Sequence, residues 1–192
     1  VPLGQGQREL IIGDRKTGKT TFVLQTILLQ ARAGTICIYA GIGGKKADIK
    51  RIEEYFVENN ILKNTVIVAT SSHDPASLIY LTPYAAMAIA EYFRDQGKNV
   101  FLVLDNLVTH PKFYREIALL SGRLPGRNSY PADIFFVHSQ LLERAGSFVT
   151  SNGDASITAF VIAETSQGDL SGYIQTNIMS MTDGHLFFDI NQ

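Results

Sequence analysis

The sequence is poor in the residues that mark secreted, zinc-bound or membrane-spanning proteins. Its 192 residues include one cysteine, Cys37, and no tryptophan. A lone cysteine forms neither an internal disulfide nor a zinc knuckle, so we expect a reducing compartment and an inert core thiol. The longest apolar stretches, such as residues 99–104 and 134–137, have strand length, and the chain opens without the charged and apolar parts of a signal peptide. We therefore expect no direct membrane insertion.

Excess charge of either sign is also missing. Lys plus Arg number 17 and Asp plus Glu 18, which gives a net charge of −1. This balance argues against a non-specific nucleic-acid binder, although it permits a local basic site for phosphate. With 45% hydrophobic residues the chain can bury a core, and its length fits one domain. Because the sequence does not begin with Met, we expect a domain excised from a longer protein.

Short apolar runs alternate with amphipathic stretches along the chain. Runs that are apolar on both faces and separated by helices predict an α/β fold, with a mostly parallel sheet covered by helices on both faces. A turn is expected at residues 41–46, and a mobile loop rich in Ser, Gly and Asn at 146–154. Strands are predicted at residues 9–12, 36–40, 65–69, 100–104, 157–163, 178–181 and 186–188. Helices are predicted at residues 17–32, 48–58, 78–96, 113–121 and 134–144.

The segment GDRKTGKT, residues 13–20, fits the phosphate-binding pattern G-x-x-x-x-G-K-S/T. Gly13 and Gly18 allow a loop whose N–H groups point at phosphate, and the following helix adds its positive end. Lys19 supplies a point charge, and Thr20 offers a hydroxyl to Mg²⁺. A chance match is the alternative, but an apolar strand precedes the motif and an apolar-faced helix follows it. The predicted nucleotide-binding residues are Gly13, Asp14, Arg15, Lys16, Thr17, Gly18, Lys19, Thr20 and Thr21.

An acid follows a buried strand in NVFLVLD, where Asp105 is the last residue. A carboxylate there can hold a Mg²⁺-bound water opposite Thr20, which makes Thr20 and Asp105 the candidate metal residues. An aspartate that caps a turn is the alternative. Within the phosphate loop, Arg15 and Lys16 either touch phosphate or face solvent, and the sequence leaves this open.

A catalytic base is harder to find. The loop after the second predicted strand, residues 41–46, contains no Glu, Asp or Gln, and Glu53 and Glu54 lie further along and are expected to face solvent. Glu164, after the fifth predicted strand, is the one candidate catalytic residue. It either senses phosphate or water, or belongs to a polar cluster that holds the sheet edge. The residues thus support binding of a nucleotide, but not its hydrolysis.

Four segments carry a family resemblance that covers nearly all of the chain. They are PLGQGQRELIIGDRKTGKTT, EYFRDQGKNVFLVLDN, LPGRNSYPADIFFVHSQLLERAG and ETSQGDLSGYIQTNIMSMTDGHLFF. Together they resemble the alpha subunits of F-type rotary ATP synthases, and the loop GDRKTGKT is closer to the alpha pattern than to the beta pattern. The resemblance implies a RecA-like P-loop NTPase fold over residues 1–192, without the family's flanking barrel and C-terminal helical domains.

The resemblance also implies a role. Alpha sites in this family bind Mg²⁺ with ATP or ADP but turn it over negligibly, in a ring where beta-type subunits alternate with alpha and a gamma-type central shaft passes through. The complex is peripheral to a membrane, in the cytoplasm or an organellar matrix. The family's usual Gln after the second strand is Gly44 here, which points further from catalysis. By resemblance the shaft contact involves Pro125, Gly126, Arg127, Tyr130, Pro131 and Asp133.

Some positions depart from the family pattern. Asn106 replaces a second Asp and Lys16 replaces a Gln, and the sequence ends before the family's adenine-pocket residues and arginine finger. We therefore expect weak nucleotide affinity and poor discrimination among bases in these residues alone. The family often has a cis peptide after the metal-binding Asp, which places it at Asp105–Asn106.

Two other functions remain open. One is an autonomous RecA-like ATPase of the type III secretion kind, and the other is a nucleic-acid motor of the Rho or RecA kind. The four histidines show no metal-ligand spacing and are expected to be solvated or hydrogen-bonded, with packing of His138 at a subunit boundary also open. Arg144 is expected to be solvated, with an acid across an interface as the alternative. Tyr80, Tyr84, Tyr92 and Phe93 are expected to pack in the core.

Overall fold

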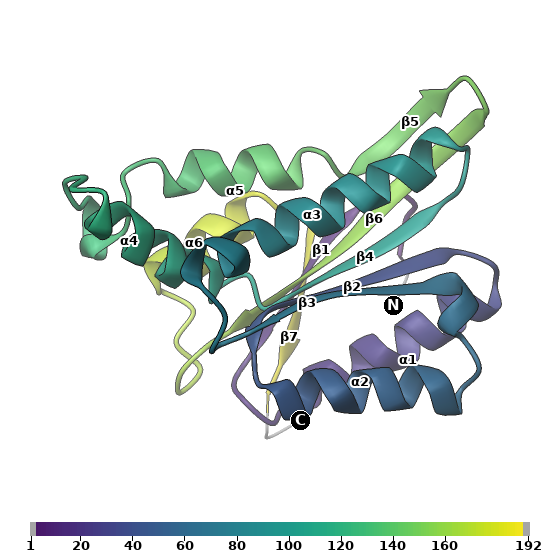
Figure 1. Ribbon diagram of the computed structural model, residues 1–192, viewed down its shortest axis with the longest axis horizontal. Helices are drawn as coiled ribbons and strands as arrows, with labels where there is room; N and C mark the ends of the chain where they lie inside the picture. Colours follow the sequence, from purple (N-terminus) through teal and green to yellow (C-terminus); the bar gives the residue numbers. More distant parts are fainter. Residues whose placement is uncertain (1–2, 190–192) are drawn as a thin grey trace.

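The computed structural model describes residues 3–189 and places them in one α/β domain (Figure 1). The described strands form a single sheet in the order β3–β2–β4–β6–β1–β7, all parallel, and β5 pairs antiparallel with β6 outside this path. The strands are β1 (Arg8–Gly13), β2 (Ile36–Gly44), β3 (Thr65–Ser71), β4 (Val100–Asp105), β5 (Gly146–Thr150), β6 (Gly153–Glu164) and β7 (Gly184–Phe188). The helices are α1 (Lys19–Arg32), α2 (Lys46–Glu58), α3 (Ala76–Asp95), α4 (His110–Leu120), α5 (Ile134–Leu142) and α6 (Tyr173–Ser180), with short 3₁₀ turns η1 (Leu62–Asn64) and η2 (Arg127–Ser129).

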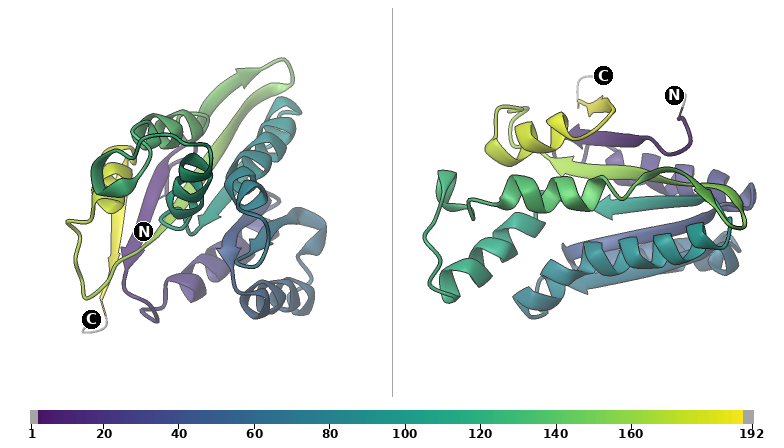
Figure 2. Two further views of the ribbon diagram at one scale, coloured as in Figure 1. Left: turned by 60° about the vertical axis from the view of Figure 1, so that its left-hand side comes forward. Right: turned by 90° about the horizontal axis from the view of Figure 1, so that it is seen from above.

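Helices cover both faces of the sheet, as predicted. Helices α1 and α2 lie on one face, and α3, α4, α5 and α6 lie on the other (Figures 1 and 2). Side chains alternate along each strand, so β4 sends Phe101 and Val103 into the core under α1 and α2, and Leu102 and Leu104 into the core on the opposite face. Both faces of β4 are buried, which explains why its sequence is continuously apolar.

The predicted strand at residues 178–181 is wrong. Residues 173–180 form helix α6, and its buried side chains Ile174 and Ile178 are four residues apart on one helical face. The apolar residues of this short segment fit a strand and a helix equally well, and packing against the sheet selects the helix.

The predicted mobile loop at residues 146–154 is also wrong. It forms strand β5, a turn and the start of β6, and Val149 pairs with Asp154 in the resulting hairpin. The Asn152-Gly153 pair at the turn is a strong hairpin signal, and Gly153 takes a left-handed φ of 112°. The turn expected at residues 41–46 is too long, because β2 continues to Gly44 and α2 begins at Lys46.

Other packing expectations are partly met. Cys37 is buried in the core, and Tyr80, Tyr84 and Phe93 pack against the core on α3. Tyr92, which was expected to join them, is 61% exposed. No helix among residues 3–189 combines the length and apolar character needed to cross a membrane.

The parallel strands bring the motif residues to one edge of the sheet. Gly13, Gly44, Asp105 and Glu164 are the last residues of β1, β2, β4 and β6. Since parallel strands all end on the same side, their carboxyl ends and the loops that follow share one rim, where open α/β sheets bind ligands.

Candidate phosphate-binding site at the carboxyl edge of the sheet

The two motif glycines are required for different physical reasons. Gly18, just before α1, has a left-handed φ of 93°, and a Cβ there would meet no atom within 4 Å. Its backbone conformation therefore demands glycine. Gly13 ends β1 beside β7, and a Cβ there would lie 2.3 Å from the carbonyl oxygen of Phe188. Close approach of a neighbouring strand demands glycine at that position.

Lys19 is buried inside the loop. Its Nζ atom donates to the carbonyl oxygens of Gly13 at 2.8 Å and Asp14 at 2.5 Å. Burial lowers the pKa of Lys19, and the carboxylates of Glu164 and Asp105 act in the opposite direction. The loop carbonyls thus hold the Lys19 ammonium near the acids at the ends of β4 and β6.

Asp105 has a partner that the sequence interpretation missed. The Tyr39 hydroxyl, on the adjacent strand β2, donates to Oδ2 of Asp105 at 2.5 Å. Gly41 pairs with Asp105 in the sheet and has no side chain beside the Tyr39 ring. A Cβ at Gly41 would lie 3.5 Å from that ring, which is van der Waals contact. A tyrosine within a buried strand needs a partner for its hydroxyl, and that was the available signal. Burial raises the pKa of Asp105 to about 6, while the hydrogen bond from Tyr39 lowers it.

Asp105 and Thr20 each carry an oxygen donor near the phosphate loop. The Thr20 side chain is exposed on the first turn of α1, and Asp105 is close enough to Lys19 for the two charges to affect each other. A hydroxyl and a carboxylate are hard oxygen donors that fit Mg²⁺, which usually takes one or two protein ligands and completes its shell with water and phosphate. The cis peptide expected at Asp105–Asn106 is present.

The first residues of the loop are tied to the segment that follows β6. The Asp14 carboxylate accepts hydrogen bonds from the Thr165 hydroxyl and from the Gly168 N–H, at 3.1 and 3.0 Å for its two oxygens. Nε of Arg15 lies 3.1 Å from Oε2 of Glu164 in an ion pair. We call these contacts between residues 14–15 and 164–168 the clasp. They show that the Arg15 side chain pairs with Glu164, while Lys16 is exposed.

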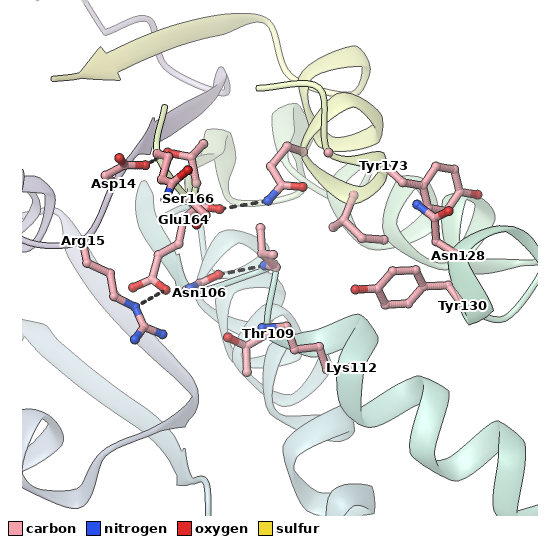
Figure 3. A pocket seen from close by; sticks show the side chains of 16 residues that line it. Asp14, Arg15, Asn106, Thr109, Lys112, Asn128, Tyr130, Glu164, Ser166 and Tyr173 are labelled. Carbon is pink, nitrogen blue, oxygen red and sulfur yellow. Dashed lines mark hydrogen bonds and ion pairs between the residues drawn. The ribbon is translucent and has the colours of Figure 1, made fainter. Parts of the chain in front are cut away.

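Two cavities open beside the loop. The larger, of about 680 Å³, runs from Arg15 and Glu164 to Lys112, Tyr130 and Tyr173. Figure 3 shows Arg15 and Glu164 joined on one side of it and Tyr130, Asn128 and Tyr173 on the other. The smaller cavity, of about 460 Å³, is lined by residues of the loop and of β7, namely Ile12, Gly13, Asp14, Thr17, Phe187 and Phe188, together with parts of the 165–170 segment.

The end of β2 offers no acid for catalysis. Gly43 and Gly44 close the strand, and a Cβ at Gly44 would meet nothing within 4 Å. Glu53 and Glu54 are exposed on α2, as predicted. Glu164 is the acid at the strand ends nearest to Arg15, and its backbone carbonyl accepts a hydrogen bond from Gln175 at 3.0 Å.

The predicted partner-contact loop lies at the far side of the larger cavity. The Arg127 guanidinium stacks 5.1 Å from the Tyr173 ring of α6, and Arg115 of α4 lies 5.1 Å from the Tyr130 ring. Asp133 accepts hydrogen bonds from the Tyr114 hydroxyl at 3.0 and 2.9 Å. Pro125 and Arg127 are exposed, Gly126, Tyr130 and Asp133 are half-buried, and Pro131 is buried.

Arg144, His110 and His138 have structural partners within the chain. The solvation expected for Arg144 is wrong, because its guanidinium contacts Glu91 within the same chain at 2.9 and 2.6 Å. His110 and His138 are buried and lie 3.1 Å apart, from Nδ1 to Nε2. Among residues 3–189 no group of three or more His, Cys, Asp and Glu side chains could hold a metal ion.

A parallel sheet with a glycine-hinged loop, a buried lysine and an acid at neighbouring strand ends defines a RecA-like P-loop nucleotide-binding domain. The chain belongs to the ATP synthase alpha/beta family, whose nucleotide-binding domain matches residues 1–192. It is 49% identical to the ATP synthase subunit alpha of Dictyoglomus thermophilum, over 98% of this chain and 37% of that protein.

Two further relatives agree. The chain is 47% identical to the ATP synthase subunit alpha of Aquifex aeolicus, over 98% of this chain and 38% of the relative. It is 48% identical to the ATP synthase subunit alpha 2 of Nitrosospira multiformis, over 97% of this chain and 37% of that relative. The resemblance to alpha subunits is thus confirmed, and the chain spans 37% to 38% of the length of these relatives.

Proposed function

We propose that this chain is the nucleotide-binding domain of an alpha-type subunit that holds ATP or ADP with Mg²⁺ and does not turn it over. The observation that carries the proposal is the position of Lys19. Its ammonium is buried within the loop and lies near the carboxylates of Glu164 and Asp105. Phosphates that enter the loop can take over the ammonium's hydrogen bonds from the Gly13 and Asp14 carbonyls, and the exposed first turn of α1 supplies N–H groups.

The cation is assigned to Thr20 and Asp105. A Mg²⁺ ion held there would supply positive charge to neutralise that of the phosphates. Thr20 offers its hydroxyl and Asp105 its carboxylate, oriented by Tyr39. The other predicted loop residues, Gly13 to Gly18 and Thr21, contribute through their backbone. The smaller cavity beside β7 is the place for the nucleoside, because it adjoins Gly13 and Thr17.

The absence of a base at the end of β2 supports a non-catalytic role. Hydrolysis needs a group that orients water near the terminal phosphate. Gly44 supplies none, and the Glu164 carboxylate is paired with Arg15. A site that binds a nucleotide without hydrolysing it acts as a regulatory and scaffolding element.

The chain's partners follow from the same proposal. We infer beta-type subunits alternating with this one in a ring, and a gamma-type central shaft contacted by the 125–133 loop, in a complex peripheral to a membrane in the cytoplasm or an organellar matrix. The exposed side chains Pro125 and Arg127 at the tip of that loop, and the very exposed Leu124 beside them, are available for such a contact.

Calorimetry on the full-length protein tests the nucleotide site. Lys19→Ala should abolish ADP binding, whereas Lys63→Ala, at an exposed lysine on η1, should leave it unchanged. Asp105→Asn should remove the Mg²⁺-dependent part of the affinity and spare the rest. Equal affinity of the wild type and Lys19→Ala would refute the proposal.

An autonomous ATPase is the second candidate, because Glu164 lies at the site, and it requires the Glu164 carboxylate to leave Arg15 and orient water. Glu164 ends β6 and lines the larger cavity with Arg15. Single-turnover hydrolysis of ATP by the wild type, lost in Glu164→Gln, would establish this alternative. Turnover at background level in both proteins would support the non-catalytic role.

A further inference from the structure

An acid at the second position of an anion-binding loop requires an explanation. A carboxylate beside a triphosphate repels it, because both are negatively charged. Asp14 stands directly after Gly13, and its carbonyl oxygen already holds the Lys19 ammonium. A side chain that only repelled the ligand would weaken the site, so the Asp14 carboxylate needs another role.

The contacts of Asp14 supply that role. Its carboxylate accepts from the Thr165 hydroxyl and from the Gly168 N–H, and the Thr165 N–H donates to the Gly13 carbonyl at 3.1 Å. These hydrogen bonds, led by that of the Thr165 hydroxyl, lower the pKa of Asp14 and keep it ionised. Hydrogen bonds to an ionised acceptor are about twice as strong as neutral ones. The negative charge is therefore directed at donors of the 165–168 segment.

The clasp also separates the two cavities. Asp14, Thr165 and Gln167 line both of them, so these residues stand between the nucleoside side and the side that faces Tyr130 and Tyr173. Gln167 and Gly168 take left-handed φ angles of 56° and 70°, which turn the segment back toward the loop. A loop tethered here is fixed at its amino-terminal end, and α1 fixes its other end.

We propose that Asp14 is a positioning residue of the phosphate site: its side chain ties the loop to Thr165 and Gly168 and does not bind phosphate. The inference rests on the proposed function, because it concerns the same site. It assigns the side chains of Asp14 and Arg15 to contacts with the neighbouring segment, and leaves phosphate recognition to the backbone and Lys19.

Repulsion and the clasp predict opposite changes in anion affinity when Asp14 is replaced. If repulsion between Asp14 and phosphate dominated, Asp14→Asn would bind anions more tightly. If the clasp dominates, Asp14→Ala should bind pyrophosphate and ADP about tenfold more weakly, a change of about 1.4 kcal/mol, with Asp14→Asn between it and the wild type. Asp169→Asn is the matched control. It removes one negative charge, as the Asp14 variants do, but the Asp169 carboxylate accepts hydrogen bonds from Ser171 and not from the phosphate loop.

Partner variants separate positioning from general destabilisation. Thr165→Val keeps the shape and removes the hydroxyl, so it should weaken pyrophosphate binding as well. Thr165→Ser restores the hydroxyl and should recover wild-type affinity. The double variant Asp14→Ala/Thr165→Val should bind no more weakly than Asp14→Ala, because both changes break one contact. Melting temperatures measured alongside show whether each variant is folded.

Each outcome decides the inference. In calorimetry on the full-length protein, Asp14→Ala should bind pyrophosphate weakly. Thr165→Ser and Asp169→Asn should bind it with the affinity of the wild type. Unchanged or tighter pyrophosphate binding by Asp14→Ala overturns the inference while leaving the phosphate site intact. A wild type that binds pyrophosphate and ADP no better than Lys19→Ala overturns both the inference and the proposed function.

Discussion

Replacing one buried histidine should change how the fold responds to acid. His110 and His138 are buried on the face covered by α3 to α6, with Nδ1 of His110 3.1 Å from Nε2 of His138. Nε2 of His110 lies 3.1 Å from the Tyr80 carbonyl, which can only accept a hydrogen bond. Nε2 of neutral His110 therefore donates, its Nδ1 accepts, and His138 donates to it. A second proton on either ring would create a buried positive charge. Neither ring has a carboxylate among its hydrogen-bond partners here to stabilise that charge.

The size of the effect follows from the pKa values. Burial lowers the pKa of His110 from 6.5 to about 4, and burial together with His110 lowers the pKa of His138 well below its usual range. Below pH 6.5 the unfolded chain takes up protons that the folded chain excludes, so stability is lost as the pH falls from 6.5 toward 4. His110 alone should lower the free energy of unfolding by about 2 kcal/mol at pH 5 and by at most about 3 kcal/mol in stronger acid.

Urea unfolding at pH 7.5 and pH 5 measures this loss. His110→Gln retains an amide donor for the Tyr80 carbonyl and an acceptor for His138, but it does not titrate. Between the two pH values, the free energy of unfolding of His110→Gln should fall by about 2 kcal/mol less than that of the wild type. His73→Gln, at an exposed histidine, should lose as much as the wild type. Equal losses in wild type and His110→Gln would refute the argument from burial.

Three smaller predictions concern single positions. Gly43→Ala should destabilise the fold by about 3 kcal/mol in urea unfolding, because its φ is 63° and the new Cβ would lie 2.9 Å from the Phe113 ring, whereas Gly34→Ala, with φ 89° and open space, should cost about 1 kcal/mol. Gly44→Glu should leave stability within about 0.5 kcal/mol and raise single-turnover hydrolysis, since a side chain fits there; no rise would show that a missing base is not what limits turnover. Arg144→Gln should destabilise the fold by about 1 kcal/mol at low salt and less at high salt, because it breaks the half-buried, two-bond ion pair between Arg144 and Glu91 of α3. A lack of salt dependence would contradict the ion-pair account.

Helices and strands whose sequence pattern fits only one secondary structure could be predicted. Short segments whose pattern fits both a helix and a strand could not. The strand before the loop, helix α1 and strand β4 were found because apolar runs and glycines agreed on one answer. Residues 178–181 and 146–154 were misassigned. The short segment 178–181, apolar at three of its four positions, fits both a helix and a strand. The turn signal of Asn152-Gly153 was overlooked beside its polar neighbours.

The site divides in the same way. Gly13, Gly18 and Lys19 belong to one continuous segment whose chemistry is local, so their pattern alone predicts a phosphate loop. The partners of Asp14, Arg15 and Asp105 could not be predicted, because they lie on other strands or beyond them. Asp14 and Thr165 are 151 residues apart in sequence, and Tyr39 and Asp105 are 66 apart.

The amino-acid sequence by itself determined the alternation of strands and helices, the glycine positions of the loop and the identity of its lysine. These depend on backbone angles and on periodicity within a few residues. Only the tertiary structure decided which acids face that lysine, which hydroxyls hold those acids and where the cavities open. Strand order places residues from distant parts of the chain at one edge, and no local pattern encodes that order.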